Sequence, residues 1–274
     1  MKIPNKYLFF LLSVLIYSCE EVTDYEFSTE ELQFIVVNGN LTNEIKSHEI
    51  TINQPISNLN QPTLPVSGAL LYVFDGDSLH ALEEDLSNPG TYKTDEGFSA
   101  VVNKPYALLI VTSEKRYHAS TYMLPVTAFK PLKYSFDEEK QLFTIDSVNQ
   151  TFDRNESAIY EVQIDWSQVE GYENIEESKK KALLYYYTLS TIDISEVFAP
   201  EKEKVYFPAG TILVESKYSL TPEHAAFIRS MLLETEWRGG FFDVAYGNLK
   251  TNLSEGAFGY FSVSTVIRDT IIVE

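Results

Sequence analysis

From residue 33 onward, short runs of alternating apolar and polar residues recur along most of the chain. Residues 48–53 and 158–166 show this alternation most clearly, and residues 34–37 form a continuous apolar run. A period of two places successive side chains on opposite faces, which is typical of half-buried strands. The predicted strands are 34–37, 48–53, 69–74, 91–94, 106–111, 116–123, 132–136, 142–145, 158–166, 183–189, 205–207, 211–215, 258–266 and 269–273. The pattern therefore predicts a mainly β protein.

Turn residues between these runs suggest how the strands are connected. Asp75-Gly76-Asp77 predicts a tight hairpin, since glycine adopts positive φ without steric cost. Gly39-Asn40 predicts a turn after the first strand, and Pro208-Ala209-Gly210 predicts a second hairpin. Short strands at this spacing indicate a β-sandwich over residues 33–125. Prolines at 125 and 131 suggest a boundary, followed by a β-rich C-terminal domain over residues 126–274.

One segment carries the signals of an amphipathic helix near residues 222–236. Thr221 suits the N-cap, Pro222 the first helical position and Glu223 the positive end of the helix dipole. Apolar residues then recur at spacings of three and four, and Gly239-Gly240 ends the segment. We therefore expect one helix in the C-terminal domain.

The first 19 residues are built like a bacterial lipoprotein signal. Lys2 and Lys6 precede an apolar run of 11 residues, which is too short to span a bilayer as a helix. Ile16-Tyr17-Ser18-Cys19 then provides a processing box that ends in the only cysteine. We expect residues 1–18 to be a signal peptide and Cys19 to be lipidated. The alternatives are an ordinary cleaved secretory signal, a retained signal anchor and a buried structural cysteine.

The residues after Cys19 are strongly acidic. Residues 20–31 contain six acidic side chains in twelve, so we interpret 19–32 as an extended, self-repelling tether. The whole chain carries a net charge of −19. Phosphate binding needs clustered lysine and arginine, so this charge argues against nucleic acid as a partner. The expected partner is the membrane, through the lipid anchor.

Catalytic and cofactor motifs are not apparent in the sequence. With Cys19 committed to lipid, thiol catalysis and cysteine-ligated metals are excluded, and the four histidines lack the spacing of a metal-binding motif. No nucleophile elbow or phosphate-binding loop is present. We therefore predict no enzymatic activity, no cofactor and no metal. A hydrolase that uses a pair of carboxylates stays open, because 40 acidic residues make chance pairs inevitable.

Aromatic residues are better candidates for binding. The segment after the helix is predicted to be a loop, where binding residues tend to collect. The candidate contact residues there are Trp237, Arg238, Phe241, Phe242, Tyr246, Asn248 and Asn252. Trp166, Tyr172 and Tyr185-Tyr186-Tyr187 are further candidates, and the competing interpretation is that most of these aromatics form the core. Three acidic–hydroxyl–apolar tripeptides resemble acceptor sites for O-glycans on exported Bacteroidetes proteins, which makes Ser78, Ser147 and Thr270 candidate glycosylation sites.

The order of several motifs resembles that of a known family. The motifs are Cys19-Glu20-Glu21-Val22, Val36-Val37-Asn38-Gly39, Pro65 to Ala69, Gly90-Thr91-Tyr92 and Asn248 to Ser262. Together they resemble Bacteroidetes outer-membrane lipoproteins known as domain of unknown function 4249. The likeness covers nearly all of the chain after Cys19, and its motifs are structural.

The resemblance implies an immunoglobulin- or transthyretin-like sandwich and an outer-membrane location. It also implies frequent association with TonB-dependent transporters, with no assigned activity. The acidic residues after Cys19 look like the signal for display on the outer face of the cell. We therefore expect a surface-exposed binding lipoprotein that acts as an accessory to such a transporter. The alternative is a structural or adhesive surface protein.

The lipid anchor can be tested by changing Cys19. Each buried methylene contributes about 0.8 kcal/mol to membrane binding, and several acyl chains together make anchoring effectively permanent. We expect the wild-type protein to sediment with membranes after a high-salt wash, and Cys19→Ala to be released. Retention of Cys19→Ala in the washed membranes would show that the anchor hypothesis is wrong.

Overall fold

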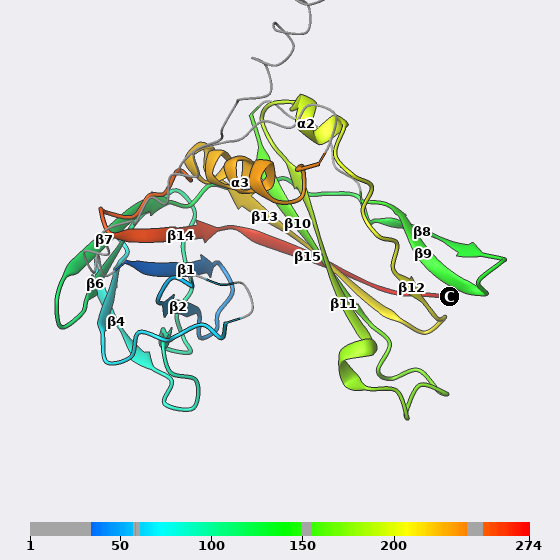
Figure 1. Cartoon of the computed structure of the whole chain (residues 1–274), viewed down its shortest axis with the longest axis horizontal. Helices are drawn as coiled ribbons and strands as arrows, with labels where there is room; N and C mark the ends of the chain where they lie inside the picture. Colours follow the sequence, from blue (N-terminus) through cyan, green and yellow to red (C-terminus); the bar gives the residue numbers. More distant parts are fainter. Residues whose placement is uncertain (1–33, 57, 59–60, 149–154, 240–248) are drawn as a thin grey trace, which may run out of the picture. The chain divides into compact units, whose positions relative to one another are not determined.

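The largest sheet has eight strands and contains the N-terminal half of the fold. The computed structural model describes residues 34–56, 58, 61–148, 155–239 and 249–274, all of which lie in one compact unit, Gln33–Glu274. The first sheet lies at the left of Figure 1. In spatial order it contains β14 (Ala257–Ser264), β1 (Ile35–Thr42), β2 (Glu49–Asn53), β5 (Thr91–Lys93), β4 (Leu79–Glu84), β3 (Leu70–Phe74), β6 (Pro105–Val111) and β7 (Arg116–Tyr122).

Two smaller sheets follow in the C-terminal half. The second sheet has the order β11 (Lys181–Thr188), β10 (Ser157–Asp165), β13 (Ile212–Leu220) and β15 (Val266–Ile272). The third has the order β12 (Tyr206–Phe207), β9 (Leu142–Ser147) and β8 (Lys133–Asp137). The helical segments are η1 (Glu177–Lys179), α2 (Ile194–Val197) and α3 (Pro222–Glu234). The prediction of a mainly β fold with a helix near 222–236 is confirmed.

The eight-stranded sheet folds over until its two end strands meet. Ser254 donates its N–H to the carbonyl of His118 in β7 at 2.8 Å, and Leu253 forms a bridge with Ala119. Burial alternates along much of β1, β2, β3 and β6, and Val37 and Ile50 are fully buried between the layers. This alternation is the period-two pattern of the sequence, and it produces the predicted sandwich core.

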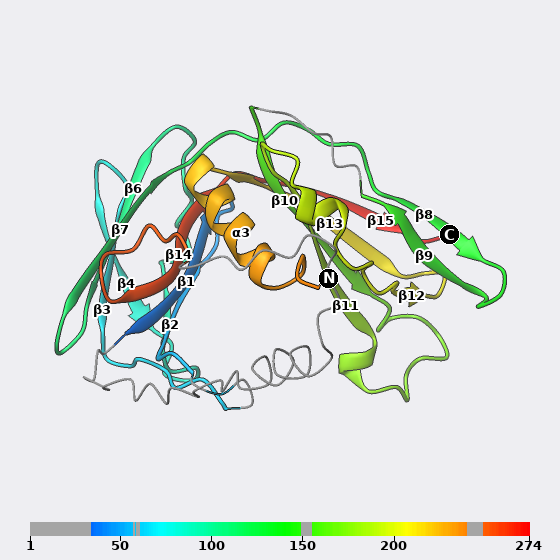
Figure 2. The same ribbon diagram turned by 45° about the horizontal axis from the view of Figure 1, so that its top comes forward.

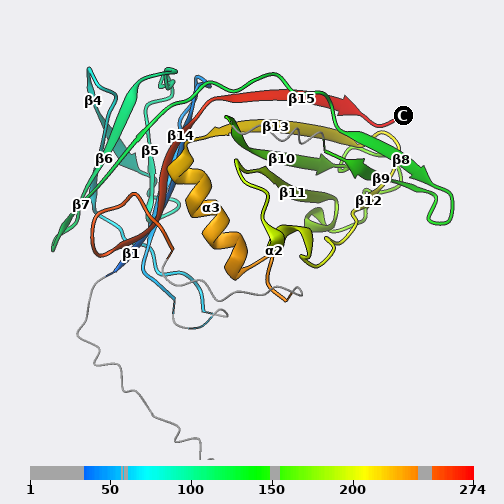
Figure 3. The same cartoon turned by 90° about the horizontal axis from the view of Figure 1, so that it is seen from above.

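The last two strands join the first sheet to the second. β14 pairs in parallel with β1, and β15 pairs antiparallel with β13, with only Thr265 between β14 and β15. Figure 3 shows β14 and β15 as one nearly continuous run through both sheets. β14, which belongs to the C-terminal domain expected over 126–274, therefore supplies an edge strand to the N-terminal sandwich expected over 33–125.

Two predicted turns are also corrected. β1 continues through Gly39-Asn40 to Thr42 instead of turning. Gly39 lies opposite Ile50 in the ladder, and a Cβ at residue 39 would lie 2.8 Å from Ile50 Cγ1, so the glycine makes room for a cross-strand side chain. The turn at 208–210 does not join a hairpin, because β12 pairs with β9 and β13 pairs with β10 and β15. The predicted hairpin at Asp75-Gly76-Asp77 is confirmed between β3 and β4.

Polar side chains from alternate residues of β13 hold the segment that connects the sandwich to the second sheet. Ser219 Oγ donates to the carbonyl of Leu124 at 2.8 Å, and Lys217 Nζ donates to the carbonyl and hydroxyl of Thr127 at 3.1–3.2 Å. Glu215 Oε2 accepts from the N–H of Leu132 at 2.8 Å. We call residues 124–132 the strap. The predicted boundary near Pro125 and Pro131 thus lies in a segment that is fixed to β13.

Helix α3 lies beside the first and second sheets. Thr221 Oγ1 accepts a hydrogen bond from the N–H of His224 at 3.2 Å, as expected of an N-cap. The buried residues Ile228 and Leu232 form the centre of a separate apolar cluster. His224 stacks on Tyr260 of β14 with ring centroids 4.4 Å apart, and Figure 2 shows the helix running past β14 and β13.

Gly259 tests the parallel pairing of β1 and β14. Its φ is +90°, and a Cβ there would overlap the backbone oxygen of Val37. We expect Gly259→Ala to lower the free energy of unfolding by about 3 kcal/mol or more. Gly68→Ala is the matched control, because its φ of +74° is similar and nothing lies within 4 Å. Its expected cost is about 1 kcal/mol. Equal losses for the two variants in chemical denaturation would contradict the pairing.

Glu215 makes the stability of the fold depend on pH. The side chain is fully buried, Oε1 has no hydrogen-bond partner among the described residues, and burial raises the pKa to about 7. The folded state therefore keeps this proton to a higher pH than the unfolded state. Its contribution is most favourable below about pH 4.5 and is lost as the pH rises toward 7.

We expect Glu215→Gln to flatten the fall in the free energy of unfolding between pH 4.5 and 7, because glutamine cannot ionise. The control is Glu139→Gln, which removes the same charge from an exposed turn. Urea denaturation across this pH range measures the effect. An unchanged slope in Glu215→Gln would contradict the assignment.

Candidate functional site

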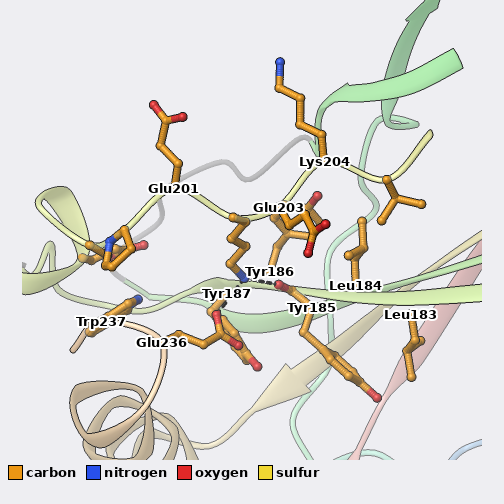
Figure 4. Close-up of a pocket in the computed structure, with 15 residues that line it drawn as sticks. Leu183, Leu184, Tyr185, Tyr186, Tyr187, Glu201, Glu203, Lys204, Glu236 and Trp237 are labelled. Atoms are coloured by element: carbon orange, nitrogen blue, oxygen red, sulfur yellow. Dashed lines mark hydrogen bonds and ion pairs between the residues drawn. The ribbon is translucent and has the colours of Figure 1, made fainter. Parts of the chain in front are cut away.

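A groove of about 850 Å³ lies along β11. One wall is residues 183–187 of this strand, and the other is the segment from Ala199 to Val205 between α2 and β12. Glu236 and Trp237, just after α3, line one end. Figure 4 shows Trp237 and Glu236 at one end and Leu183 and Leu184 at the other. The volume falls within the range that small-molecule sites occupy.

Three consecutive tyrosines provide the aromatic surface of the groove. Tyr185 is 37% exposed, whereas Tyr186 and Tyr187 are half-buried. Burial raises the pKa of Tyr185 and of Tyr187 to about 12, with further contributions from neighbouring carboxylates, and burial also raises the pKa of Tyr186. The phenols are therefore neutral at physiological pH, and they can stack on a ligand or donate hydrogen bonds.

Lys202 crosses the groove from the opposite wall. Its Nζ donates to the carbonyl oxygen of Tyr185 at 2.6 Å and forms an ion pair with Glu236 Oε2 at 2.8 Å. The same ammonium lies 5.1 Å from the ring centroid of Tyr186 and 5.6 Å from that of Tyr187. These distances are within the range of cation–π attraction. A backbone carbonyl, a carboxylate and two aromatic rings thus form a cation site, which we call the Lys202 cage.

The rim of the groove is acidic on balance. Glu201, Glu203 and Lys204 follow one another around Lys202, and Figure 4 shows Glu201 and Lys204 on the wall opposite β11. Glu196 of α2 also lines the groove, and burial together with Asp193 raises its pKa. Because Glu236 is paired with Lys202, the remaining rim charges are three carboxylates and one ammonium group.

The structure brings two groups of predicted contact residues together in this groove. Trp237 lies beside Tyr185-Tyr186-Tyr187, although the indole is 6% exposed and also packs in the apolar cluster of α3. Arg238 is exposed and faces Glu234 at 3.6 Å. Trp166 is buried in the core of the second sheet, so the core interpretation holds for that aromatic. Phe241, Phe242, Tyr246 and Asn248 lie outside the described residues.

Asn252 has its amide committed to the backbone of the sandwich. Nδ2 donates to the carbonyls of Phe261 and Ser120 at 2.7 and 3.1 Å, and Oδ1 accepts from the N–H of Phe261 at 3.2 Å. These bonds tie β14 to β7 where the eight-stranded sheet closes. The side chain is not among those that line the groove, and it serves the sheet.

The other predicted site residues are scattered. Ser78 lies in the hairpin turn between β3 and β4, Ser147 ends β9, and Thr270 lies on β15; all three are exposed. Exposure is compatible with modification, and glycosylation stays a prediction. Cys19 lies outside the described residues, so its lipidation also stays a prediction.

A second hollow lies next to α2 and is open to solvent. Its lining residues are Thr191, Ile192, Asp193, Ile194 and Arg229. Asp193 accepts a hydrogen bond from the N–H of Ser195 at 3.0 Å and pairs with Arg229, so its carboxylate caps α2 and fixes α3. Within the described ranges, no group of three or more His, Cys, Asp or Glu side chains gathers in a way that could hold a metal ion.

Sequence reasoning missed Lys202 and the wall that carries it. Glu201-Lys202-Glu203-Lys204 alternates in charge, which is typical of a solvated surface, and nothing local indicates that one lysine reaches β11. The tyrosine run was the usable signal, because three consecutive aromatics on an edge strand place rings on both faces.

The chain is similar to a crystal structure of chicken CNTN1 FN1-FN3 domains, with 11% sequence identity and a TM-score of 0.25. The match covers 69% of this chain and 63% of that chain, so this chain spans less than two thirds of its length. No curated protein matches.

The family comparison covers nearly the whole chain. The profile described as "Domain of unknown function (DUF4249)" matches residues 20–270, from the acidic tether to β15. It includes β1 to β14 in full, β15 as far as Thr270, and the groove beside β11. The resemblance inferred from the sequence motifs is thereby confirmed, and the chain belongs to the DUF4249 family.

Proposed function

We propose that this protein is a non-enzymatic binding lipoprotein of the outer membrane, which acts as an accessory to a TonB-dependent transporter and binds that transporter through the groove beside β11. The observation that carries the proposal is the Lys202 cage on an aromatic wall. Aromatic rings and a few fixed polar groups in a groove of this volume are the usual features of a ligand site.

The chemistry of the groove favours binding over catalysis. Its tyrosines are neutral at physiological pH, so they are unsuited to act as bases. Glu236 is paired with Lys202 at 2.8 Å, and Glu201 and Glu203 lie on the exposed rim. Acid–base catalysis is most efficient when a group has a pKa near the working pH, and the phenols depart from that requirement.

The proposed location follows from the N-terminal sequence. Cys19 would hold the protein at the membrane, and the acidic tether would extend the folded unit away from the lipid surface. No helix in the described part of the chain is long and apolar enough to cross a membrane. Lipid anchoring and the tether motivate the accessory role, because both keep the groove close to a transporter in the same membrane.

Co-purification from native membranes tests this function. We expect affinity-tagged full-length protein, solubilised in detergent, to retain a β-barrel transporter that mass spectrometry identifies. Tyr185→Ala should reduce the recovered transporter by about tenfold or more, since loss of a contacted aromatic is typical of a binding hot spot. Tyr122→Ala is the matched control, because Tyr122 is 39% exposed at the end of β7, which does not line the groove.

Recovery of the transporter with wild type and Tyr122→Ala, but not with Tyr185→Ala, would support the proposal. Absence of any β-barrel protein from the wild-type preparation would contradict the accessory role. Equal recovery with all three proteins would contradict the assignment of the groove.

A further inference from the structure

The outer edge of β11 presents backbone groups to the groove. β11 is the terminal strand of the second sheet within the described residues, and β10 pairs with its other edge. In an antiparallel strand the N–H and C=O of one residue point to the same side, and that side alternates along the strand. The carbonyl of Tyr185 accepts from Lys202 across the groove, so the backbone of Tyr185 faces outward. Leu183, two residues earlier, therefore also faces the groove.

At this edge of β11, the side chain of Lys202 occupies the place where the backbone of a neighbouring strand would lie. Its four-carbon stem extends from the opposite wall, and its ammonium contacts β11. A neighbouring strand would need about 4.8 Å of space beside β11. The lysine thus supplies one N–H donor to Tyr185 at the place where an added strand would supply its own backbone donor.

We propose that the groove takes an extended polypeptide segment as an additional strand on β11, with Lys202 as an internal stand-in that the segment displaces. This inference rests on the proposed binding function and names its ligand class. Strand addition to an exposed sheet edge derives affinity from main-chain hydrogen bonds and specificity from side-chain pockets. The tyrosine rings on β11 provide those pockets.

The charges of the groove favour a basic polypeptide segment as its ligand. The Lys202 cage combines Glu236, the Tyr185 carbonyl and two aromatic rings around one ammonium. When Lys202 leaves, the Tyr185 carbonyl accepts from the segment's own N–H, and a lysine or arginine of the segment can place its cation beside Glu236 and the two rings. The acidic rim and the net charge of −19 also attract a positively charged chain.

A defined peptide tests strand addition. The probe is a fluorescent peptide of alternating threonine and valine with one central lysine, and its partner is the full-length protein in detergent. The control peptide has the same side chains but carries N-methyl groups along the backbone, so it cannot donate main-chain hydrogen bonds. Fluorescence anisotropy measures both affinities.

Three variants separate the effect of the Lys202 ammonium on peptide binding from that of the Leu183 backbone N–H. Lys202→Met keeps the stem but removes the competing ammonium, so the probe should bind about tenfold more tightly than to wild type. Leu183→Pro removes an outward N–H without breaking the β10 ladder, and it should weaken binding by about tenfold. Leu183→Ala keeps that N–H and should bind within about threefold of wild type.

Saturable binding of the probe, loss of binding on N-methylation and tighter binding to Lys202→Met are the expected results. Equal affinity for the N-methylated peptide, or no gain with Lys202→Met, would overturn strand addition, and neither result depends on the folding of Leu183→Pro. If the probe fails to bind while Tyr185→Ala still loses the transporter, the groove is a functional site whose ligand is not a strand. If Tyr185→Ala keeps the transporter but the probe binds as expected, the strand site exists without the accessory role.

Discussion

The parallel pairing of β1 with β14 is the interaction on which the rest of the fold depends. It joins residues 35–42 to residues 257–264, and β14 continues into β15 after one residue. The second sheet therefore takes its edge strand from the same run that completes the first. Gly259 permits this pairing because it has no side chain to meet the Val37 oxygen. Parallel pairs need long crossover connections, and here that connection is most of the chain.

A second connection fixes the strap to β13. Lys217 Nζ forms an ion pair with Glu156 Oε1 at 2.5 Å in addition to its bonds with Thr127, and Ser219 accepts from the N–H of Thr265 while donating to Leu124. Buried polar groups cost free energy unless they are hydrogen-bonded, so these pairings make the position of the strap specific. Because β13 lies two strands from β11, the same sheet carries both the strap and the groove.

Local signals predicted most elements well but could not predict their partners. Thr221 and Pro222 predicted the start of α3, and Gly76 predicted its hairpin, because capping and positive φ are properties of a few adjacent residues. Gly39 was misread as a turn, since only its cross-strand neighbour Ile50 explains it. Phe207 pairs with Phe143 of β9 instead of forming a hairpin with β13, and alternation carries no information about a partner so distant in sequence.

Local signals likewise predicted the elements of the candidate site but not how they meet. The aromatic run at 185–187 and Trp237 were visible in the sequence, whereas the cage depends on Lys202, whose neighbours in the chain all suggest a solvated surface. The ammonium acquires its role only because the segment after α2 lies across from an edge strand. Edge strands are usually protected by charges or by a covering segment, and Lys202 gives β11 such protection at one carbonyl.

Hydrogen exchange at single-residue resolution shows directly whether a strand adds to β11. The amides of Leu183 and Tyr185 face the groove, whereas the amide of Leu184 faces β10. With the lysine-containing peptide bound, we expect new protection at Leu183 and Tyr185, and unchanged protection at Leu184. Unchanged exchange at both outward amides with the peptide bound would contradict the addition of a strand to β11.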